Sequence, residues 1–365
     1  MRILHISSAK SFGGGEKHLI DLCRGLKESG HDVFVAVRPT CEWKSRLSFL
    51  PEENICTVSI RNSFGLLSSK RLASFVRAKD IEIIHAHLGR DYITASIVAR
   101  LVSPLKCVLT RHVLFPLKAF NRFVLANVDR IIAVSEDVRL SLSGVFESKK
   151  IRVIYNGSDS MMKSADEGAD CRSRLRAELD VQESTILIGL IGTVSEVKGQ
   201  DLAVEAIGIL KEIPDLKLVI LGKADSPKDP FLLKLRVQIG SSDYRDRVIF
   251  LESEGAIEDL MPGFDIILSS SRSESFGLVI LESMIAGVPV VATPTRGATL
   301  LLENGNCGFI AKGFEAQSIA EAIRECLSED RSRTRKMASA TSRAALLFTL
   351  KRMVEKTEGV YRELL

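Results

Sequence analysis

The stretch IILSSSRSESFGLVILESMIAGVPVVA, residues 266–292, decides the fold. An apolar strand at 266–268 leads into a serine-rich polar loop, and an apolar helix begins near Phe276. A Gly-Val-Pro break then precedes a second apolar strand at 290–292. This order of strand, helix and strand predicts two neighbouring strands of a parallel sheet, and hence an α/β fold.

Two carboxylates lie eight positions apart in this stretch, Glu274 in the loop and Glu282 inside the helix. Ligands of open α/β sheets bind beyond the carboxyl ends of the strands, where a helix N-terminus offers free amides to an anion. We therefore expect the amides from about Phe276 to Leu278 to hold a phosphate and the carboxylates to hold a sugar hydroxyl. Taken alone, a helix cap and a solvated helix face would explain the same pair.

The length and composition of the chain predict two soluble domains. Its 365 residues exceed what one core usually carries, and 45% of them are hydrophobic. Met1 leads at once into the strand RILHIS, and no apolar run approaches the 18 or so residues of a membrane span. The expected location is therefore cytoplasmic. Seven scattered cysteines, without a C-x-x-C pair, indicate free thiols rather than a disulfide framework or a zinc site.

The net charge of +4 is unevenly distributed, because residues 1–160 carry +9 and the remainder −5. A basic first half suits an anionic membrane face, an anionic acceptor or phosphates in the site. An unevenly charged solvated surface is the alternative.

The first unit of the chain is a βαβ pattern with glycines at its first turn. The strand at 2–7 is followed by the loop SAKSFGGGEK, an amphipathic helix and the strand at 32–37. Glycines at this turn let backbone amides approach a phosphate. The triplet lacks both the P-loop spacing and the dinucleotide fingerprint, which argues against a Rossmann oxidoreductase.

All six histidines lie within the first 112 residues. His85 and His87 share one face of an expected strand and suggest a metal pair. Since no third ligand accompanies them at a suitable spacing, we favour histidines packed at a strand end.

The segment RHVLFPLKAFNRFVLANVDR, residues 111–130, interleaves cations with aromatic side chains. Such a mixture docks on lipid headgroups or holds an acceptor. We favour the alternative of a partly buried loop and helix, with aromatic side chains in the core and charges outside. A nucleic-acid partner has no other support and is not expected.

The second half repeats the logic of the first. Residues 158–184 are polar and charged, which predicts a linker with one short helix near 171–179. The strand TILIGLIG, the loop TVSEVKGQ and an apolar-faced helix follow, and the tail from 315 to 365 is helical by pattern.

The stretch 266–292 resembles the donor-site signature of the retaining glycosyltransferases of family 4, which have the GT-B fold. Their pattern is roughly S-x-x-E-G-F-G-x-x-x-x-E-A-M-A-x-G-x-P-V-V-A. The sequence departs from it mildly, at Ser275, Ser283 and Ile285. The pattern is met at Ser271, Glu274, Phe276, Gly277, Glu282, Met284, Gly287, Pro289, Val290 and Val291.

Three further matches lie in the first 160 residues. Gly13 and Gly14 fill a G-G-x-E loop that leans over the donor diphosphate in this family. His112 ends a T-x-H match to the family's active-site histidine, which lies near the donor sugar and the acceptor. An N-G-x-D match at 156–159 marks the crossing into the second domain.

The family's phosphate loop, G-R-x-x-x-x-K-G, is matched in part. Lys198 is retained, but Thr193 replaces the arginine, so one of two phosphate cations is missing from its usual place. Arg272 and Arg296 are the candidates to replace it.

The resemblance covers essentially the whole chain and implies a GT-B fold of two Rossmann-like doubly wound domains facing a central cleft. Residues 1–160 would form the acceptor-side domain and residues 161–346 the nucleotide-sugar donor domain. A C-terminal helix at about 347–365 would pack back on the first domain.

The implied reaction moves a sugar from a nucleotide-diphosphate sugar to a glycan or lipid-linked acceptor hydroxyl, with retained configuration. Many such enzymes build cell-surface polysaccharide, lipopolysaccharide or glycolipid, which extends the expected location to the cytoplasmic face of the inner membrane, with peripheral contact to anionic lipid. The implied catalytic residues are Glu274 and His112. The implied donor-binding residues are Gly13, Gly14, Lys198, Gly277, Leu278 and Glu282.

No metal and no other cofactor is expected, because the D-x-D motif of metal-dependent glycosyltransferases is missing. Lys198 and the backbone amides would stabilise the leaving diphosphate electrostatically. Two alternatives remain open, a UDP-sugar 2-epimerase or hydrolase of the same fold and a non-catalytic nucleotide-sugar-binding protein. The first would turn over its substrate without an acceptor, and the second would bind without turnover.

Overall fold

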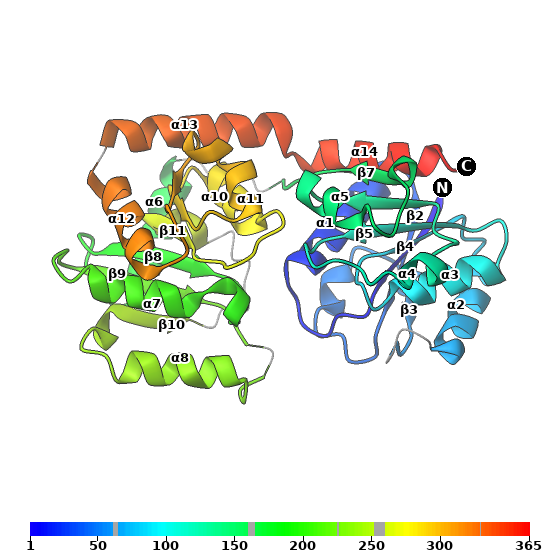
Figure 1. The fold of residues 1–365 in the computed structure, drawn as a ribbon, viewed down its shortest axis with the longest axis horizontal. Coiled ribbons are helices and arrows are strands. Elements are labelled where there is room, and N and C mark those ends of the chain that lie inside the picture. Colours follow the sequence, from blue (N-terminus) through cyan, green and yellow to red (C-terminus); the bar gives the residue numbers. More distant parts are fainter. Residues whose placement is uncertain (61–64, 160–164, 225, 252–259, 329) are drawn as a thin grey trace. The chain divides into compact units, whose positions relative to one another are not determined.

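The structure is a computed structural model that describes residues 1–60, 65–159, 165–224, 226–251, 260–328 and 330–365. The chain divides into two units (Figure 1). Unit 1 comprises Met1–Gly157 and Thr349–Leu365, and unit 2 comprises Ser158–Phe348. The sequence places these boundaries at about 160 and 346.

Unit 1 is built on a parallel sheet of seven described strands in the order β3-β2-β1-β4-β5-β6-β7. Ile3 in β1 pairs with Val33 on one side and with Ile83 on the other. Such strands are rich in Val and Ile because a parallel sheet is covered on both faces. The strands are β1 (Arg2–Ser7), β2 (Asp32–Val37), β3 (Ile55–Thr57), β4 (Ile83–Ala86), β5 (Lys106–Arg111), β6 (Arg130–Ala133) and β7 (Ile151–Val153).

Helices α1 and α14 cover one face of this sheet and pack against each other. Their backbones approach closely at Gly25, where an added Cβ would lie 2.5 Å from Val354 Cγ2. The C-terminal helix α14 therefore belongs to unit 1. The helices of unit 1 are α1 (Gly14–Glu28), α2 (Leu66–Ala78), α3 (Tyr92–Leu101), α4 (Asn121–Val124), α5 (Glu136–Leu142) and α14 (Leu350–Arg362).

Unit 2 contains a second parallel sheet, with described strands in the order β10-β9-β8-β11-β12-β13. Ile267 pairs with Val290, so the two strands of the stretch 266–292 are parallel neighbours, as predicted. The strands are β8 (Ile186–Ile191), β9 (Leu216–Leu221), β10 (Val248–Leu251), β11 (Ile266–Ser269), β12 (Val290–Ala292) and β13 (Phe309–Ile310). The apolar run RVIFLE, residues 247–252, also reads as a strand and contains β10, although Glu252 lies outside the described residues.

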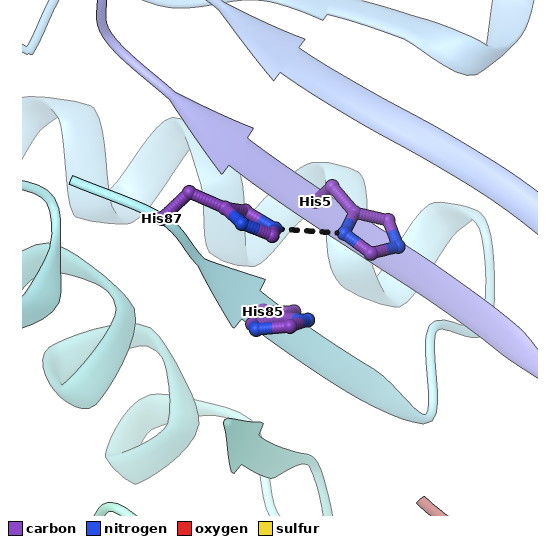
Figure 2. Close-up of side chains that lie close together, drawn as sticks. All are labelled: His5, His85 and His87. Atoms are coloured by element: carbon purple, nitrogen blue, oxygen red, sulfur yellow. Dashed lines mark hydrogen bonds between the residues drawn. The ribbon is translucent and has the colours of Figure 1, made fainter. Parts of the chain in front are cut away.

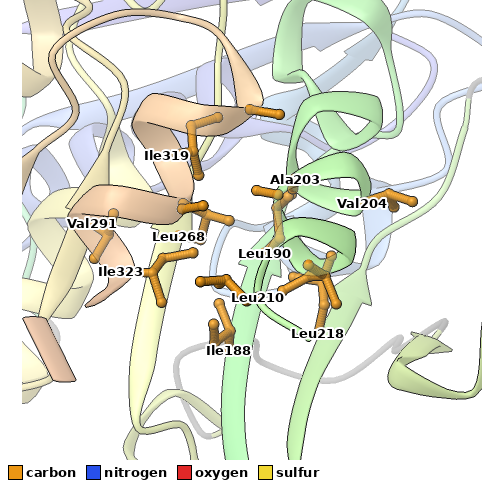
Figure 3. Packing of buried hydrophobic residues seen from close by; sticks show 14 of the residues in the cluster. Ile188, Leu190, Ala203, Val204, Leu210, Leu218, Leu268, Val291, Ile319 and Ile323 are labelled. Carbon is orange, nitrogen blue, oxygen red and sulfur yellow. The ribbon is translucent and has the colours of Figure 1, made fainter. Parts of the chain in front are cut away.

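Alternating residues of β8 enter two cores. Ile188 and Leu190 face α7 and α12, where Ala203 and Ile323 meet them (Figure 3). Leu187 belongs to the cluster on the opposite face. This period of two explains why β8 reads as a continuous apolar run.

The predicted helix near 171–179 is present as part of α6, but the interpretation of the segment 158–184 as a linker is wrong. Helix α6 is longer than expected and is packed into unit 2, because Arg176 is 2% exposed and donates to the Asp265 carboxylate at 2.9 Å. The helices of unit 2 are α6 (Ala165–Glu178), α7 (Gln200–Ile209), α8 (Pro230–Gly240), α10 (Leu278–Ala286), α11 (Arg296–Leu301), α12 (Ala316–Ser328) and α13 (Asp330–Leu347). The helical tail is as predicted.

Within the part of the chain that the structure describes, no helix combines the length and the apolar character needed to cross a bilayer.

Candidate functional site

The polar loop after β11 is fixed by hydrogen bonds from three directions. Ser270 Oγ donates to the carbonyl of Gly199 at 2.9 Å, and Thr293 Oγ1 donates to that of Ser271 at 2.6 Å. The amide of Gly297 donates to the carbonyl of Glu274 at 2.9 Å. The backbone that carries Glu274 is therefore held in place before any ligand arrives.

Lys198 and Glu274 meet at the carboxyl ends of β8 and β11. Lys198 Nζ lies 2.6 Å from Glu274 Oε2, and their side chains are 30% and 17% exposed. Both line a small cavity, so the structure brings together two residues that lie 76 positions apart. The cavity is lined by Leu190, Ile191, Lys198, Leu268, Ser269, Ser270, Ser271, Glu274, Gly277, Val279 and Ile280.

Helix α10 begins at the wall of this cavity. Gly277 precedes it with φ 95°, a left-handed conformation that favours glycine, and an added Cβ would lie 3.1 Å from Ile280 Cδ1. The helix therefore starts at Leu278, two residues later than predicted from the pattern. The first-turn amides of an α-helix have no partner within the helix, so they are suited to an anion.

Glu282 lies deeper in the same helix. It is 4% exposed and lies in the second turn of the helix, eight positions after Glu274. The structure thus gathers Lys198, Glu274 and Gly277 around the cavity and places Glu282 within the buried side of α10.

Arg272 is committed to a structural ion pair. Its guanidinium donates to both Asp201 oxygens at 2.8 and 2.7 Å and to the carbonyl of Glu196 at 2.7 Å. Burial raises the pKa of Asp201, but the hydrogen bonds and charge of Arg272 outweigh this effect and lower the pKa overall. Arg296, the exposed first residue of α11, is therefore the better candidate for a second phosphate cation.

In unit 1, the glycine loop joins β1 to α1. Gly13 caps the helix with φ −152°, an ordinary extended conformation, and Gly14 is the first helical residue. Glu16 is buried and accepts a hydrogen bond from Ser7 Oγ at 3.3 Å. Burial raises the pKa of Glu16, and hydrogen bonds to its carboxylate offset part of the shift.

His112 follows β5 and belongs to a cluster of five histidines. Its ring centroid lies 4.7 Å from that of His18 and 6.0 Å from that of His87. His85 and His87 in turn pack against His5 (Figure 2). The inference that no third ligand accompanies His85 and His87 is therefore wrong, because β1 and β4 pair in register and set His5 opposite His85.

These imidazoles are neutral at pH 7. Burial lowers the pKa of His5 to about 3 and that of His18 to about 4, with smaller effects from neighbouring groups. Burial also lowers the pKa values of His85, His87 and His112 well below 6.5, and the charge of nearby groups lowers them further. Each ring can therefore donate one hydrogen bond and accept one.

The structure of the aromatic segment 111–130 contradicts our favoured interpretation, in which the aromatic side chains lie in the core and the charges outside. Phe115, Phe120 and Phe123 are 63%, 48% and 80% exposed, whereas the Arg111 side chain is buried and donates to the carbonyl of Phe115. Aromatic side chains thus project into solvent and one cation lies inside.

Asp91 is a buried carboxyl that the sequence analysis missed. The amide of Ser8 donates to its Oδ2 at 2.8 Å, and burial raises its pKa to about 6. Its position directly before α3, after the strand β4, was the available signal.

Comparison with models of protein families gives one match for each unit. Residues 12–160 match the family model of glycosyltransferase family 4, and residues 172–344 match that of glycosyl transferases group 1. The fold and these matches define a two-domain glycosyltransferase with the GT-B fold. The chain belongs to the glycosyltransferases of the family 4 type.

Named relatives act in several pathways. N-acetyl-alpha-D-glucosaminyl L-malate synthase of Bacillus anthracis is 24% identical over 83% of this chain and 80% of its own length. Lipopolysaccharide core biosynthesis glycosyltransferase LpsE of Rhizobium meliloti is 25% identical over 92% of this chain and 91% of its own length. Anabaena Alr3699/HepE, solved in complex with UDP-glucose, shares the fold with a TM-score of 0.87 at 23% identity, over 100% of both chains.

Proposed function

We propose that this glycosyltransferase moves a sugar from a nucleotide-diphosphate sugar to an acceptor hydroxyl with retention of configuration. The observation that carries the proposal is the Lys198–Glu274 pair beside the first turn of α10. A cation, free amides and a carboxylate around one cavity suit a sugar diphosphate. The UDP and UDP-glucose complexes of HepE support a nucleotide-sugar donor.

Charge that develops on the leaving diphosphate is the main barrier to such a transfer, and prepositioned donors lower it without reorganisation. Lys198 and the amides of Gly277 and Leu278 would supply these donors. On donor binding, a phosphate oxygen replaces Glu274 as the partner of Lys198. Glu274 is then released toward the transferred sugar, where it accepts hydrogen bonds or stabilises positive charge on the ring.

The remaining roles follow the resemblance. Glu282 accepts hydrogen bonds from the ribose hydroxyls, and the amides of Gly13 and Gly14 contribute to diphosphate binding. His112, neutral at pH 7, exchanges hydrogen bonds with hydroxyls of the sugar or the acceptor. None of these steps requires a metal ion.

The acceptor that we propose is a glycan or lipid-linked saccharide of the cell surface. Two relatives from Rhizobium meliloti, LpsB and LpsE, are named for lipopolysaccharide core biosynthesis and support this assignment. The aromatic segment supports a lipid surface, since Phe115, Phe120 and Phe123 are exposed beside Lys118 and Arg122. Exposed aromatic rings with flanking cations suit an anionic bilayer interface.

Vesicle sedimentation tests the membrane contact. The wild-type protein should sediment with anionic vesicles and much less with zwitterionic ones, and a triple Phe115/Phe120/Phe123→Ser variant should remain in solution. Leu67→Ser removes an equally exposed apolar residue, 83% exposed, elsewhere in unit 1 and should change nothing. Equal sedimentation of both variants would remove the support for this surface.

A thermal-shift screen against UDP, GDP, ADP, CDP and dTDP tests the donor site. One diphosphate should raise Tm, and Lys198→Ala should abolish the shift. Lys211→Ala, which removes a lysine paired with Asp243 on the same unit, should retain it. The absence of a shift with every diphosphate would contradict the proposal.

Turnover of the matching sugar nucleotide then tests the reaction. Wild-type protein should require an acceptor and give a product whose anomeric configuration matches that of the donor, while Glu274→Gln should lose most activity. Consumption of the donor without an acceptor would indicate an epimerase or hydrolase instead.

A further inference from the structure

Three histidines converge at the carboxyl edge of the sheet in unit 1. His18 comes from the second turn of α1, and His87 and His112 directly follow β4 and β5. One ring nitrogen of each lies within 4.8 Å of the others. They meet because β1, β4 and β5 are consecutive neighbours in the sheet and their carboxyl ends share one edge.

Two of these rings have nitrogen atoms available for a ligand. His18 and His87 are 5% and 3% exposed, and neither nitrogen of His18 nor Nδ1 of His87 has a hydrogen-bond partner among the described residues. The carboxamide of Asn156 lies close enough to His18 to offset part of its pKa shift, but without good hydrogen-bond geometry. Buried polar nitrogens are normally satisfied, so unsatisfied ones within one close cluster indicate a missing partner.

The imidazole ring of His87 is already held in one orientation by a hydrogen bond of its other nitrogen. Its Nε2 lies 3.0 Å from His5 Nδ1 (Figure 2). Histidines that bind metal ions typically donate their second N–H to a neighbouring acceptor, which fixes the ring and its tautomer. His5 can play this part for His87, which leaves Nδ1 of His87 as the ligand atom.

A second group, His5, His85 and His87, is equally close but is less suited to an ion. His85 Nδ1 lies 2.6 Å from the hydroxyl of Tyr361, and its Nε2 lies 2.7 Å from Thr110 Oγ1. Both nitrogens of His85 are therefore occupied, and its role is structural.

Neutral imidazoles restrict the kind of ion. Zn²⁺, Co²⁺ and Ni²⁺ accept imidazole ligands, whereas Mg²⁺ and Ca²⁺ prefer oxygen. Bonds of about 2.0 Å in tetrahedral geometry place ligand nitrogens about 3.3 Å apart, so side-chain rotations must draw the rings inward. His112 is the half-buried member of the three and leaves a position open to solvent. The nearby charge of Arg111 opposes a dication and so favours an anionic fourth ligand.

We infer that His18, His87 and His112 form a binding site for a borderline transition-metal ion of the Zn²⁺ class, with His5 as the positioning residue behind His87. The ion binds through three nitrogens and keeps its fourth position for a hydroxide or another anion. Because His112 is the proposed sugar- or acceptor-contacting residue, the bound ion inhibits transfer. This inhibitory consequence rests on the proposed function, whereas the binding itself does not.

Co²⁺ titration of the untagged protein tests the site directly. A Cys41→Ser background removes the half-buried thiol. We expect one equivalent of Co²⁺ with the visible absorption of tetrahedral nitrogen and oxygen ligation, and displacement by Zn²⁺. His112→Ala and His18→Ala should weaken binding by about 100-fold or more, and His5→Phe by about 10- to 100-fold. His31→Gln, which removes the histidine outside the cluster, should bind as the wild type does.

Three results would overturn the inference. They are the absence of tetrahedral Co²⁺ absorption, unchanged affinity in His112→Ala, or loss of binding in His31→Gln. Fluorescence of Trp43, the single tryptophan and a core residue of unit 1, verifies that each variant is folded. Zn²⁺ inhibition that persists in the His18→Ala variant would place the inhibitory ion elsewhere.

Discussion

Acidification from about pH 7 to about pH 5.5 should destabilise unit 1 by about 4 kcal/mol. Four of its histidines are buried, and burial holds their folded-state pKa values well below the usual 6.5. They are His5, His18, His85 and His87; His112 is only half-buried and is not counted. In the unfolded chain each returns to a pKa of about 6.5, so the unfolded state binds more protons as the pH falls. Stability is therefore lost on acidification.

The magnitude follows from the unfolded pKa alone, because the folded rings stay neutral over this range. Each histidine contributes about 1.2 kcal/mol between these two pH values, and four contribute about 5 kcal/mol. Asp91 acts in the opposite direction, since its pKa of about 6 in the folded state lets the buried carboxyl take up a proton first. Protonation of Asp91 reduces the loss of stability by about 0.8 kcal/mol, so the net loss is about 4 kcal/mol. The total stability of a protein is typically 5–15 kcal/mol.

Urea unfolding followed by Trp43 fluorescence measures this change in unit 1. Unit 2 contains no histidine and serves as an internal reference in far-UV circular dichroism. His87→Gln should reduce the pH dependence by about 1.2 kcal/mol, whereas His31→Gln, outside the cluster, should leave this contribution in place. A loss of less than about 1 kcal/mol in the wild type would refute the conclusion that these rings are held neutral by burial.

Three further predictions concern unit 2. Gly199→Ala should destabilise unit 2 by about 3 kcal/mol, because φ is 65° and the new Cβ would lie 2.2 Å from the carbonyl oxygen of Ser270. The control Gly287→Ala has a similar φ of 69° but no described atom within 4 Å of the new Cβ, so it should cost only about 1 kcal/mol. Equal shifts of Tm in the two variants would refute this reasoning. Arg176→Ala removes a buried guanidinium that donates to the Asp265 carboxylate and to the carbonyls of Gly263 and Thr185, and should cost about 2–3 kcal/mol in chemical denaturation, because Asp265 keeps its pair with Arg172. Arg174→Ala, 69% exposed on the same helix, should cost less than about 0.5 kcal/mol. Thr193→Arg restores the phosphate cation of the family pattern and should lower the Kd of a nucleoside diphosphate by about tenfold, as measured by calorimetry. An equal decrease in the Thr193→Val variant would show that charge is not the cause.

Local patterns predicted the parts of the fold that local physics determines. The strand at 290–292 coincides with β12, and β11 and β8 were located within one residue at each end, because apolar runs bounded by polar loops and by Gly-Val-Pro leave few alternatives. Helix α10 started later than predicted because Gly277 adopts a left-handed conformation that spacing does not reveal.

Long-range pairing explains what was missed. The helix α6 looks like a linker because it is mostly polar and one of its buried residues is an arginine. Burial of Arg176 depends on the Asp265 carboxylate, 89 positions away, and on the carbonyls of Gly263 and Thr185. The histidine cluster is invisible to spacing for the same reason, since His5 and His87 lie 82 positions apart and meet through the pairing of β1 with β4. Lys198 and Glu274 were individually predicted through the resemblance, but their ion pair was not.

Both groups of candidate residues occupy the same topological position in their own sheets. The strand order reverses between β1 and β4 in unit 1 and between β8 and β11 in unit 2. Loops diverge at such a switch point and leave a crevice at the carboxyl ends of the two central strands. Lys198 follows β8 and Glu274 follows β11, just as the glycine loop follows β1 and His87 follows β4. Knowledge of the strand order would therefore have located both sites, because the position of a switch point depends on the topology of the sheet and not on any single motif.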